Sequence, residues 1–198
     1  MRIALALGAW LDHEPAWLAP PEADRLLAAV RTELCWEQRA IVLFGRPVVQ
    51  PRLIAWAGDV DYRYSGQTLE PRPFTSTLAA LLAGVRDRTG ASFNHVLVNR
   101  YRDGRDSIGL HADDERELGT DPIVATVSLG TTRRFVLKPR RKMAGGGTAL
   151  DLLHGSLVVM GGSCQRHYVH GVPRQVDVRD ERISLTFRQI ERGSGSLR

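Results

Sequence analysis

A histidine and an aspartate two residues apart, His111 and Asp113, constrain this chain most, because a second histidine, His170, follows much later. On an extended strand, residues i and i+2 point to the same face, so these two side chains can bind one metal together. The third ligand must come from another strand that the fold brings alongside. Two histidines and one carboxylate suit a mononuclear iron(II) site with three open positions. A histidine–aspartate pair also arises by chance, as a surface histidine beside a solvated aspartate.

Length and composition place the chain among ordinary globular proteins. Its 198 residues suffice for one domain with a substantial core, and 43% of them are hydrophobic and 25% charged. No apolar run is long enough to span a membrane. The apolar residues 3–10 resemble a signal peptide only faintly. Cys35 and Cys164 form neither a metal-binding spacing nor a disulfide framework, so we expect a cytoplasmic protein. Separately, we expect the protein to act as a monomer.

The net charge of +5 and the sequence pI near 9.8 suit a polyanionic partner. Each phosphate that a basic side chain neutralises releases counterions, which favours nucleic-acid binding. The basic residues are nearly all arginine, with only Lys138 and Lys142 as lysines. Such a bias can also reflect genome composition, so charge alone leaves the partner open.

The first half of the chain predicts two helices with a loop-rich stretch between them. Pro20 and Pro21 open the first helix, and Thr75 caps a second helix that ends near Gly90. Residues 40–44 predict a strand, whereas 48–74 contain many prolines and glycines and predict loops. Exposed aromatic residues interleaved with arginines in that stretch are able to stack on bases and contact phosphates, or else the rings pack under a long loop. These residues are Trp56, Tyr62, Tyr64, Arg52, Arg63 and Arg72.

The second half predicts strands. Alternation over 93–101 places Asn99 and Tyr101 on one face. Residues 123–129 and 133–138 predict two strands joined as a hairpin at 130–132. Shorter strands are predicted over 156–160 and 166–170, the latter with Arg166, Tyr168 and His170 on one face. The residues 139–147 predict a basic loop, either a phosphate contact or a solvated tip.

The last predicted strand, residues 182–188, has one apolar and one polar face. Ile183, Leu185 and Phe187 point one way, and Arg182, Ser184, Thr186 and Arg188 point the other. The two arginines lie about 20 Å apart along the backbone at ~3.3 Å per residue, so at least one must reach along the strand, or they bind different ends of one dicarboxylate. An edge strand with a solvated face has the same pattern. Helices followed by many short strands indicate a β-sandwich or jelly roll backed by helices.

Several linked motifs resemble the AlkB family of iron(II)- and 2-oxoglutarate-dependent dioxygenases, in particular its animal-type alkylated-DNA repair branch. They are FNHVLVNRYRDGRDSIGLHADDERELG, PIVATVSLG, LHGSLVVM, HYVHGVP and RISLTFRQI, in this order. The resemblance implies an α+β fold with a double-stranded β-helix (jelly-roll) core backed by N-terminal helices. It implies a single domain over 1–198, with an N-terminal extension and nucleotide-recognition lid over about 1–74, the core over about 91–190 and a flexible tail over 191–198.

The same resemblance implies which residues hold the metal and the co-substrate. His111, Asp113 and His170 match the iron ligands, and His167 is then a packing residue. Asn99 and Tyr101 match positions that hydrogen-bond 2-oxoglutarate, and Thr186 lies on the same strand face as the arginines. Arg188 is expected at the distal carboxylate of 2-oxoglutarate and Arg182 near the carboxylate that binds iron, since planar arginine suits carboxylates.

On the substrate side the resemblance implies a lid over residues 61–66, in which Tyr64 stacks on the damaged base against His111, with Tyr62 nearby. Asp114 and Glu115 match acidic positions that suit cationic methylated bases. Phe44 matches a finger that fills the gap left by a flipped base, although a core phenylalanine would look the same. Arg52 completes the expected substrate contacts.

The implied reaction uses iron(II), 2-oxoglutarate and molecular oxygen to demethylate alkylated DNA bases such as 1-methyladenine and 3-methylcytosine. Formaldehyde, succinate and carbon dioxide are the products. The alternatives are an oxygenase of the same fold that acts on RNA, a protein or a small molecule, a basic nucleic-acid-binding protein without catalysis, and a zinc hydrolase.

Overall fold

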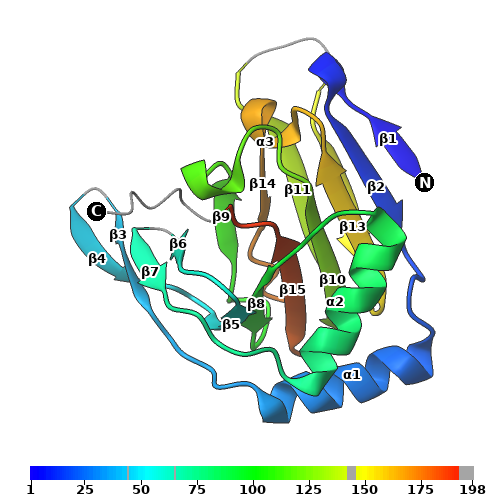
Figure 1. Ribbon diagram of the computed structural model, residues 1–198, viewed down its shortest axis with the longest axis vertical. Coiled ribbons are helices and arrows are strands. Elements are labelled where there is room, and N and C mark those ends of the chain that lie inside the picture. The colour runs from blue at the N-terminus through cyan, green and yellow to red at the C-terminus, as the bar shows by residue number, and fades with distance from the viewer. Residues whose placement is uncertain (44, 65, 142–145, 192–198) are drawn as a thin grey trace.

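A seven-stranded sheet forms one layer of the computed structural model, which describes residues 1–43, 45–64, 66–141 and 146–191 (Figure 1). Its strands are β1 (Arg2–Ala4), β2 (Trp10–Glu14), β5 (Leu53–Gly58), β8 (His95–Tyr101), β10 (Val124–Gly130), β13 (Ser156–Gly161) and β15 (Arg182–Arg188). They are ordered β1-β2-β13-β10-β15-β8-β5, and every neighbouring pair is antiparallel. Strands β1, β2 and β5 come from the stretch predicted as an extension, so the core draws on that stretch as well.

A four-stranded sheet packs against the first and completes the expected jelly roll. Its strands are β9 (Ile108–His111), β11 (Arg133–Pro139), β12 (Thr148–Leu152) and β14 (Tyr168–Val172), in the order β12-β11-β14-β9. An apolar cluster between the sheets joins residues of both, including Leu137 and Tyr168 from the smaller sheet and Val158 and Met160 from the larger one. The functional residues described below lie beside this cluster.

Helices α1 (Pro20–Glu33) and α2 (Ser76–Thr89) cover the outer face of the larger sheet, as Figure 1 shows. Both were predicted. Proline starts α1 because its fixed φ and missing N–H suit a first turn. The Thr75 hydroxyl accepts a 3.2 Å hydrogen bond from the Leu78 N–H, and Gly90, at φ 70°, ends α2 in the left-handed region.

Strand β15 lies in the middle of the larger sheet and is buried on both faces, so it is not an edge strand. The predicted alternation is confirmed. Ile183, Leu185 and Phe187 join the core under the helices. The opposite face carries the polar residues, and the register pairs Arg182 with Tyr101 and Ser184 with Asn99. Directly paired residues share a face, so these polar side chains all project between the two sheets.

Two small hairpins lie together at one side of the molecule (Figure 1). They are formed by β3 (Ala40–Leu43) with β4 (Arg46–Val49) and by β6 (Tyr62–Tyr64) with β7 (Gln67–Leu69). The Gln67 side chain donates a hydrogen bond to the Ala40 carbonyl and so joins the two hairpins. The prediction of loops over 48–74 was therefore wrong, because four short strands occupy much of that stretch.

Two predictions about strand connections also need correction. Residues 123–138 do not form a hairpin: β10 belongs to the larger sheet and β11 to the smaller one, and the chain crosses between them after Gly130, at φ 88°. Residues 164–167 form a short helix, α3 (Cys164–His167), so the predicted strand over 166–170 begins only at Tyr168. Two 3-10 turns complete the fold, η1 (Ala6–Gly8) and η2 (Arg116–Leu118).

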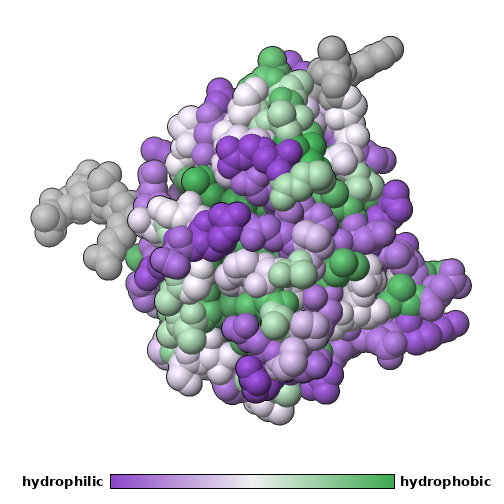
Figure 2. Space-filling view, turned by 90° about the vertical axis from the view of Figure 1, so that its right-hand side faces the viewer, coloured by the Kyte–Doolittle hydropathy of each residue, from purple (hydrophilic) through white to green (hydrophobic). Residues whose placement is uncertain are grey.

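The face turned toward the viewer in Figure 2 carries hydrophilic side chains over much of its area, with small hydrophobic areas between them. Within the part of the chain that the structure describes, there is no helix long and apolar enough to cross a membrane.

Candidate metal centre

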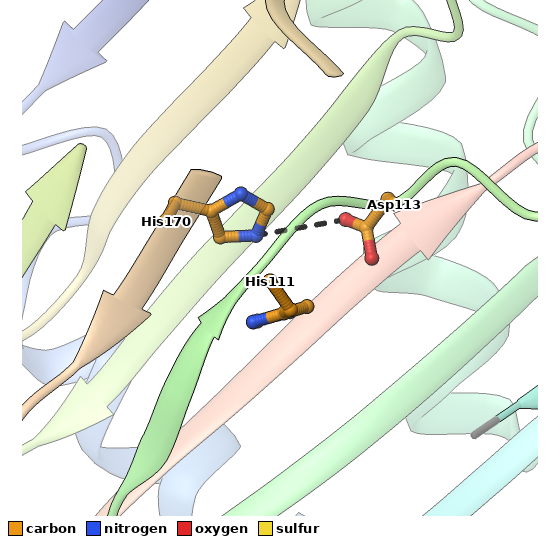
Figure 3. Close-up of side chains that lie close together, drawn as sticks. All are labelled: His111, Asp113 and His170. Atoms are coloured by element: carbon orange, nitrogen blue, oxygen red, sulfur yellow. Dashed lines mark ion pairs between the residues drawn. The ribbon is translucent and has the colours of Figure 1, made fainter. Parts of the chain in front are cut away.

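The side chains of His111, Asp113 and His170 lie close together and point toward one another, as Figure 3 shows. Their candidate ligand atoms all lie within 4.8 Å of one another, and the two imidazole centroids are 4.4 Å apart. His111 ends β9 and His170 lies opposite it on β14, in direct register. The neighbouring strand thus supplies the third ligand, as the sequence predicted.

Asp113 does not lie on a strand, which corrects the expected geometry. Strand β9 ends at His111, and Asp113 follows in an irregular segment. Its backbone N–H donates a 3.0 Å hydrogen bond to the side-chain oxygen of Gln165, which is buried in α3. The carboxylate is therefore directed by a hydrogen bond from a distant helix, and the i, i+2 alternation of a strand does not apply.

The donor set fits a divalent metal. Nδ1 of His111 lies 2.9 Å from the Gly109 carbonyl oxygen, which favours a proton on Nδ1 and leaves Nε2 free to bind a metal. Oδ2 of Asp113 is buried, has no hydrogen-bond partner among the described residues, and lies 3.7 Å from Nε2 of His170. Buried polar atoms are nearly always satisfied, so an orphaned carboxylate oxygen between two imidazoles indicates an iron(II) site.

Electrostatics hold the three groups in their metal-binding protonation states. Burial and, to a smaller extent, the neighbouring His111 together lower the pKa of His170 to about 3. Burial also lowers the pKa of His111. Burial alone would raise the pKa of Asp113, but attraction from Arg188 and the two imidazoles lowers it to about 2. At neutral pH the site therefore presents two neutral imidazoles and one carboxylate.

Arg188 is the immediate partner of the metal carboxylate. Its Nη2 donates a 2.7 Å hydrogen bond to Oδ1 of Asp113, and both side chains are almost fully buried. Burial alone would lower the pKa of Arg188, but Asp113, Tyr62 and Glu115 raise it. The remaining Nε and Nη1 of Arg188 have no hydrogen-bond partner in the part of the chain that the structure describes, so this guanidinium still has donors for a second anion.

Arg182 lies at the other end of the polar face of β15. Its Nη2 donates a 2.8 Å hydrogen bond to the Ser128 hydroxyl, and Nε and Nη1 have no partner. The expectation that Arg182 lies at the metal end and Arg188 at the distal end was wrong, because Arg188 is the arginine that contacts Asp113. The order of the two arginines along the pocket is reversed.

A single pocket joins the metal ligands to both arginines. Thr186 lines it and accepts a 3.3 Å hydrogen bond from Thr126, and Asn99 and Tyr101 line the same wall, as their alternation predicted. The other lining residues are Tyr64, Leu97, Ile108, His111, Thr126, Phe135, Leu152, Val158, Met160, His170, Gly171, Val172, Arg182, Ser184 and Arg188. The lining thus combines both arginines and several uncharged polar side chains with apolar ones.

The lid residues are buried, contrary to the expectation that these aromatic rings are exposed. Tyr62 is 0% exposed and Tyr64 is 5% exposed. Tyr64 lines the pocket, and its hydroxyl accepts a 2.7 Å hydrogen bond from Arg52. Arg52 also donates to Asn99 at 2.6 Å and is only 5% exposed, so it connects the lid to the pocket wall and is not placed to bind phosphate.

Trp56 and Arg72 of this stretch also have internal partners, whereas Arg63 has none among the described residues. Trp56 is 4% exposed, and the guanidinium carbon of Arg72 lies 3.5 Å from its ring centroid. Arg72 also pairs with Glu37. Arg63 is exposed. Phe44 lies outside the described residues, so its assignment to a finger stays a prediction.

The two acidic residues that follow Asp113 differ in environment. Glu115 is partly buried, and burial, together with the neighbouring Asp113, raises its pKa. Its Oε2 has no hydrogen-bond partner. Asp114 is exposed and forms an ion pair with Arg140 from the basic loop. Glu115 is therefore directed inward, whereas Asp114 contacts a surface arginine.

Sequence reasoning missed residues that position the site without touching a metal. Gln165 holds Asp113, and Arg133, which is fully buried, donates to the carbonyls of Asp103, Asp106 and Pro173. The burial of Arg133 could not be predicted from the strand pattern. Alternation predicts on which face of the sheet a residue lies, but not which groups its side chain contacts there.

A protein-family model described as the 2OG-Fe(II) oxygenase superfamily matches residues 11–188. The chain is 37% identical over 184 residues to "Alpha-ketoglutarate-dependent dioxygenase alkB homolog 3" of Rattus norvegicus, covering 89% of this chain and 62% of that protein. It is 38% identical over 182 residues to "DNA oxidative demethylase ALKBH2" of Mus musculus, covering 85% of this chain and 75% of the relative.

Among solved structures, "The structure of OsALKBH1" superimposes with a TM-score of 0.64 at 17% identity, covering 90% of this chain and 97% of that chain, which supports the fold. The chain belongs to the 2OG-Fe(II) oxygenase superfamily and, within it, to the AlkB family. It spans 62% of the length of the alkB homolog 3 protein from Rattus norvegicus.

Proposed function

We propose that this protein is an iron(II)/2-oxoglutarate-dependent dioxygenase that demethylates alkylated DNA bases, such as 1-methyladenine and 3-methylcytosine. The observation that carries the proposal is the orphaned Oδ2 of Asp113 between two neutral imidazoles, at one end of a pocket that also contains two arginines with free donors. The names of the relatives, which include a DNA oxidative demethylase, support this choice of substrate.

His111, Asp113 and His170 would hold the iron, which with 2-oxoglutarate and oxygen supplies the oxidative step that releases the methyl carbon as formaldehyde and forms succinate. Arg188 binds Asp113 and has donors left for the carboxylate of 2-oxoglutarate nearest the metal. Arg182 offers two free donors to the distal carboxylate. The arginines thus bind opposite ends of one dicarboxylate, with Asn99, Tyr101 and Thr186 along its length.

The substrate base would enter beside Tyr64, which lines the same pocket as His111. Glu115 presents an inward carboxylate close to this entrance, which suits a cationic methylated base. Closure of the lid over the base would exclude water from the metal. The stacking of Tyr64 on the base, with Tyr62 behind it, and the contacts of Asp114 and Phe44 are predictions of the same proposal.

The proposal is tested by incubating the iron(II)-loaded protein with 2-oxoglutarate and methylated oligonucleotides, single-stranded and duplex, and by measuring formaldehyde. We expect formaldehyde and succinate in equal amounts from methylated DNA, dependent on oxygen and on 2-oxoglutarate. The His111→Ala variant is the control. Formaldehyde from methylated RNA or peptide alone would instead support another substrate for the same chemistry.

The remaining alternatives give different results. A nucleic-acid-binding protein without catalysis would bind methylated DNA and form no succinate. A zinc hydrolase would be active with zinc and without 2-oxoglutarate. That the protein acts as a cytoplasmic monomer stays a prediction, with which the two free cysteines, Cys35 and Cys164, agree.

A further inference from the structure

Tyr101 lies close to two buried guanidinium groups that come from different sheets. Arg182 belongs to β15 of the larger sheet and Arg133 to β11 of the smaller one. Their guanidinium carbons lie 5.2 Å and 5.5 Å from the centre of the Tyr101 ring, and the two side chains are 1% and 0% exposed. Two positive charges are thus buried beside one aromatic ring.

Carboxylate partners are missing from both groups within the described residues. Arg133 donates to the backbone carbonyls of Asp103, Asp106 and Pro173 and to the side-chain oxygen of Gln175. Arg182 donates to the Ser128 hydroxyl and leaves two nitrogens free. Neutral acceptors satisfy the donors of Arg133, and the carboxylates of Asp103 and Asp106 attract its charge only from a distance. Buried charges normally require a counter-charge in direct contact, which Arg182 in particular lacks within the described residues.

The two arginines also affect one another. Burial lowers the pKa of Arg182 to about 10, and the positive charge of Arg133 adds to this lowering, while Tyr101 opposes it. Both groups are still charged at neutral pH, and they repel. An anion that binds to the free nitrogens of Arg182 would be attracted by both charges and would relieve their repulsion.

We propose that Arg133 is a positioning residue whose charge fixes the distal carboxylate of the co-substrate at Arg182 and so selects a dicarboxylate over a monocarboxylate. The inference rests on the proposed use of 2-oxoglutarate. Arg133 is not among the residues that line the pocket, within the described part of the chain. It acts from behind Tyr101 through charge, and its four oxygen acceptors hold it there.

The simpler role for Arg133 is to tie two loops together. Its acceptors lie in the segments that precede β9 and follow β14, the strands that carry His111 and His170. A role in loop geometry alone would affect every ligand of the pocket, whereas a role through charge affects only ligands with a distal carboxylate. Binding of ligands with and without a distal carboxylate therefore distinguishes the two roles of Arg133.

The experiment measures the dissociation constants of 2-oxoglutarate and of 2-oxopentanoate, which lacks the distal carboxylate, for the manganese(II)-loaded protein by calorimetry. We compare the wild type with Arg133→Gln, Arg133→Lys and Arg134→Gln, the last being an exposed neighbour. Circular dichroism checks that each variant is folded. Because no turnover is needed, the result does not depend on the nucleic-acid substrate.

We expect Arg133→Gln to weaken 2-oxoglutarate binding on the order of tenfold and to leave 2-oxopentanoate within about twofold. Arg133→Lys should retain most of the preference for 2-oxoglutarate over 2-oxopentanoate, and Arg134→Gln should retain all of it. Equal losses for both acids, or the same loss in the lysine as in the glutamine variant, would overturn the inference. If the glutamine variant does not fold, loss of the preference in a folded lysine variant overturns it. A wild type that binds neither acid would overturn the proposed function as well.

Discussion

Arg188 donates a 2.7 Å hydrogen bond to Oδ1 of Asp113, and the two side chains are 4% and 2% exposed. The contact fixes one carboxylate oxygen and leaves the other facing the two imidazoles. It also joins the metal ligand, which lies after the short strand β9, to β15, an interior strand of the larger sheet. The position of the metal carboxylate therefore depends on a residue 75 positions further along the chain.

Replacing Arg188 with glutamine should weaken metal binding roughly 10- to 100-fold, because residues that orient metal ligands have effects of this size. Without the guanidinium, the Asp113 carboxylate loses both its hydrogen bond and the attraction that lowers its pKa. Titration with manganese(II) in the absence of 2-oxoglutarate measures the metal affinity alone. Arg166→Gln, which removes a more exposed ion pair with Asp121, is the matched control. A folded Arg188→Gln protein with wild-type affinity would contradict this role.

His111 and Tyr64 should be separable by their effects on the metal. His111→Ala removes a ligand and should abolish iron binding, together with any support that its ring gives to the base. Tyr64→Ala should retain iron binding but weaken the binding of methylated oligonucleotides, with stacking contributing about 1–3 kcal/mol per base. Iron content and oligonucleotide affinity, measured on the same preparations, test this. Loss of iron in the folded Tyr64→Ala protein would show that the tyrosine has a different role.

Arg52 should couple the lid to the co-substrate wall, since it donates to both Asn99 and the Tyr64 hydroxyl. Arg52→Met leaves two buried acceptors unpaired and should lower the free energy of unfolding by about 1–3 kcal/mol for each. Tyr64→Phe removes only one of these bonds and should cost less. Urea denaturation of both single variants and of the double variant gives the coupling free energy between Arg52 and the Tyr64 hydroxyl. Strict additivity would argue against a shared network.

His95 should make the protein sensitive to acid. Its ring is fully buried against Gly58 and Tyr62, both nitrogens lack partners, and burial lowers its pKa to about 3. Between the unfolded pKa near 6.5 and the folded value, the unfolded state binds a proton that the folded state does not. Stability is therefore complete above about pH 6.5 and decreases as the pH falls toward 3.

His95→Leu should remove this contribution, which we expect to reach about 3 kcal/mol between pH 6.5 and pH 4. The measurement is the free energy of unfolding at several pH values for the wild type and the variant. The difference between them should change with pH below 6.5 and stay constant above it. Parallel stability curves over the whole range would show that His95 is not responsible.

The sequence was sufficient to predict the ligand triad, both long helices and the two-faced last strand. The second helix and the last strand follow from local rules, a cap at Thr75 and alternation over 182–188. The triad was predicted from the histidine–aspartate pattern and the family resemblance, although Asp113 lies beyond the strand whose spacing was expected to place it. The polar face of β15 was predicted correctly because alternation fixes which residues share a side. The jelly roll was expected from the number of strands and from the family resemblance.

The features that sequence missed depend on the tertiary fold. Strands β10 and β11 have a short connection typical of a hairpin, but each pairs within a different sheet. The lid tyrosines and Trp56 look exposed among prolines and glycines, yet β5 and the β6–β7 hairpin bury them. The order of Arg182 and Arg188 along the pocket depends on where Asp113 lies after leaving its strand. None of these relationships can be predicted from a local sequence pattern.

The most direct test of the account is an anaerobic titration of the protein with iron(II) and 2-oxoglutarate, followed by exposure to oxygen in the presence of DNA containing 1-methyladenine or 3-methylcytosine. The account predicts one equivalent of bound iron, binding of 2-oxoglutarate that depends on the metal, and formaldehyde equal to the methyl groups removed, all lost in Asp113→Ala. Iron and 2-oxoglutarate binding without oxygen-dependent formaldehyde release from methylated DNA would contradict it.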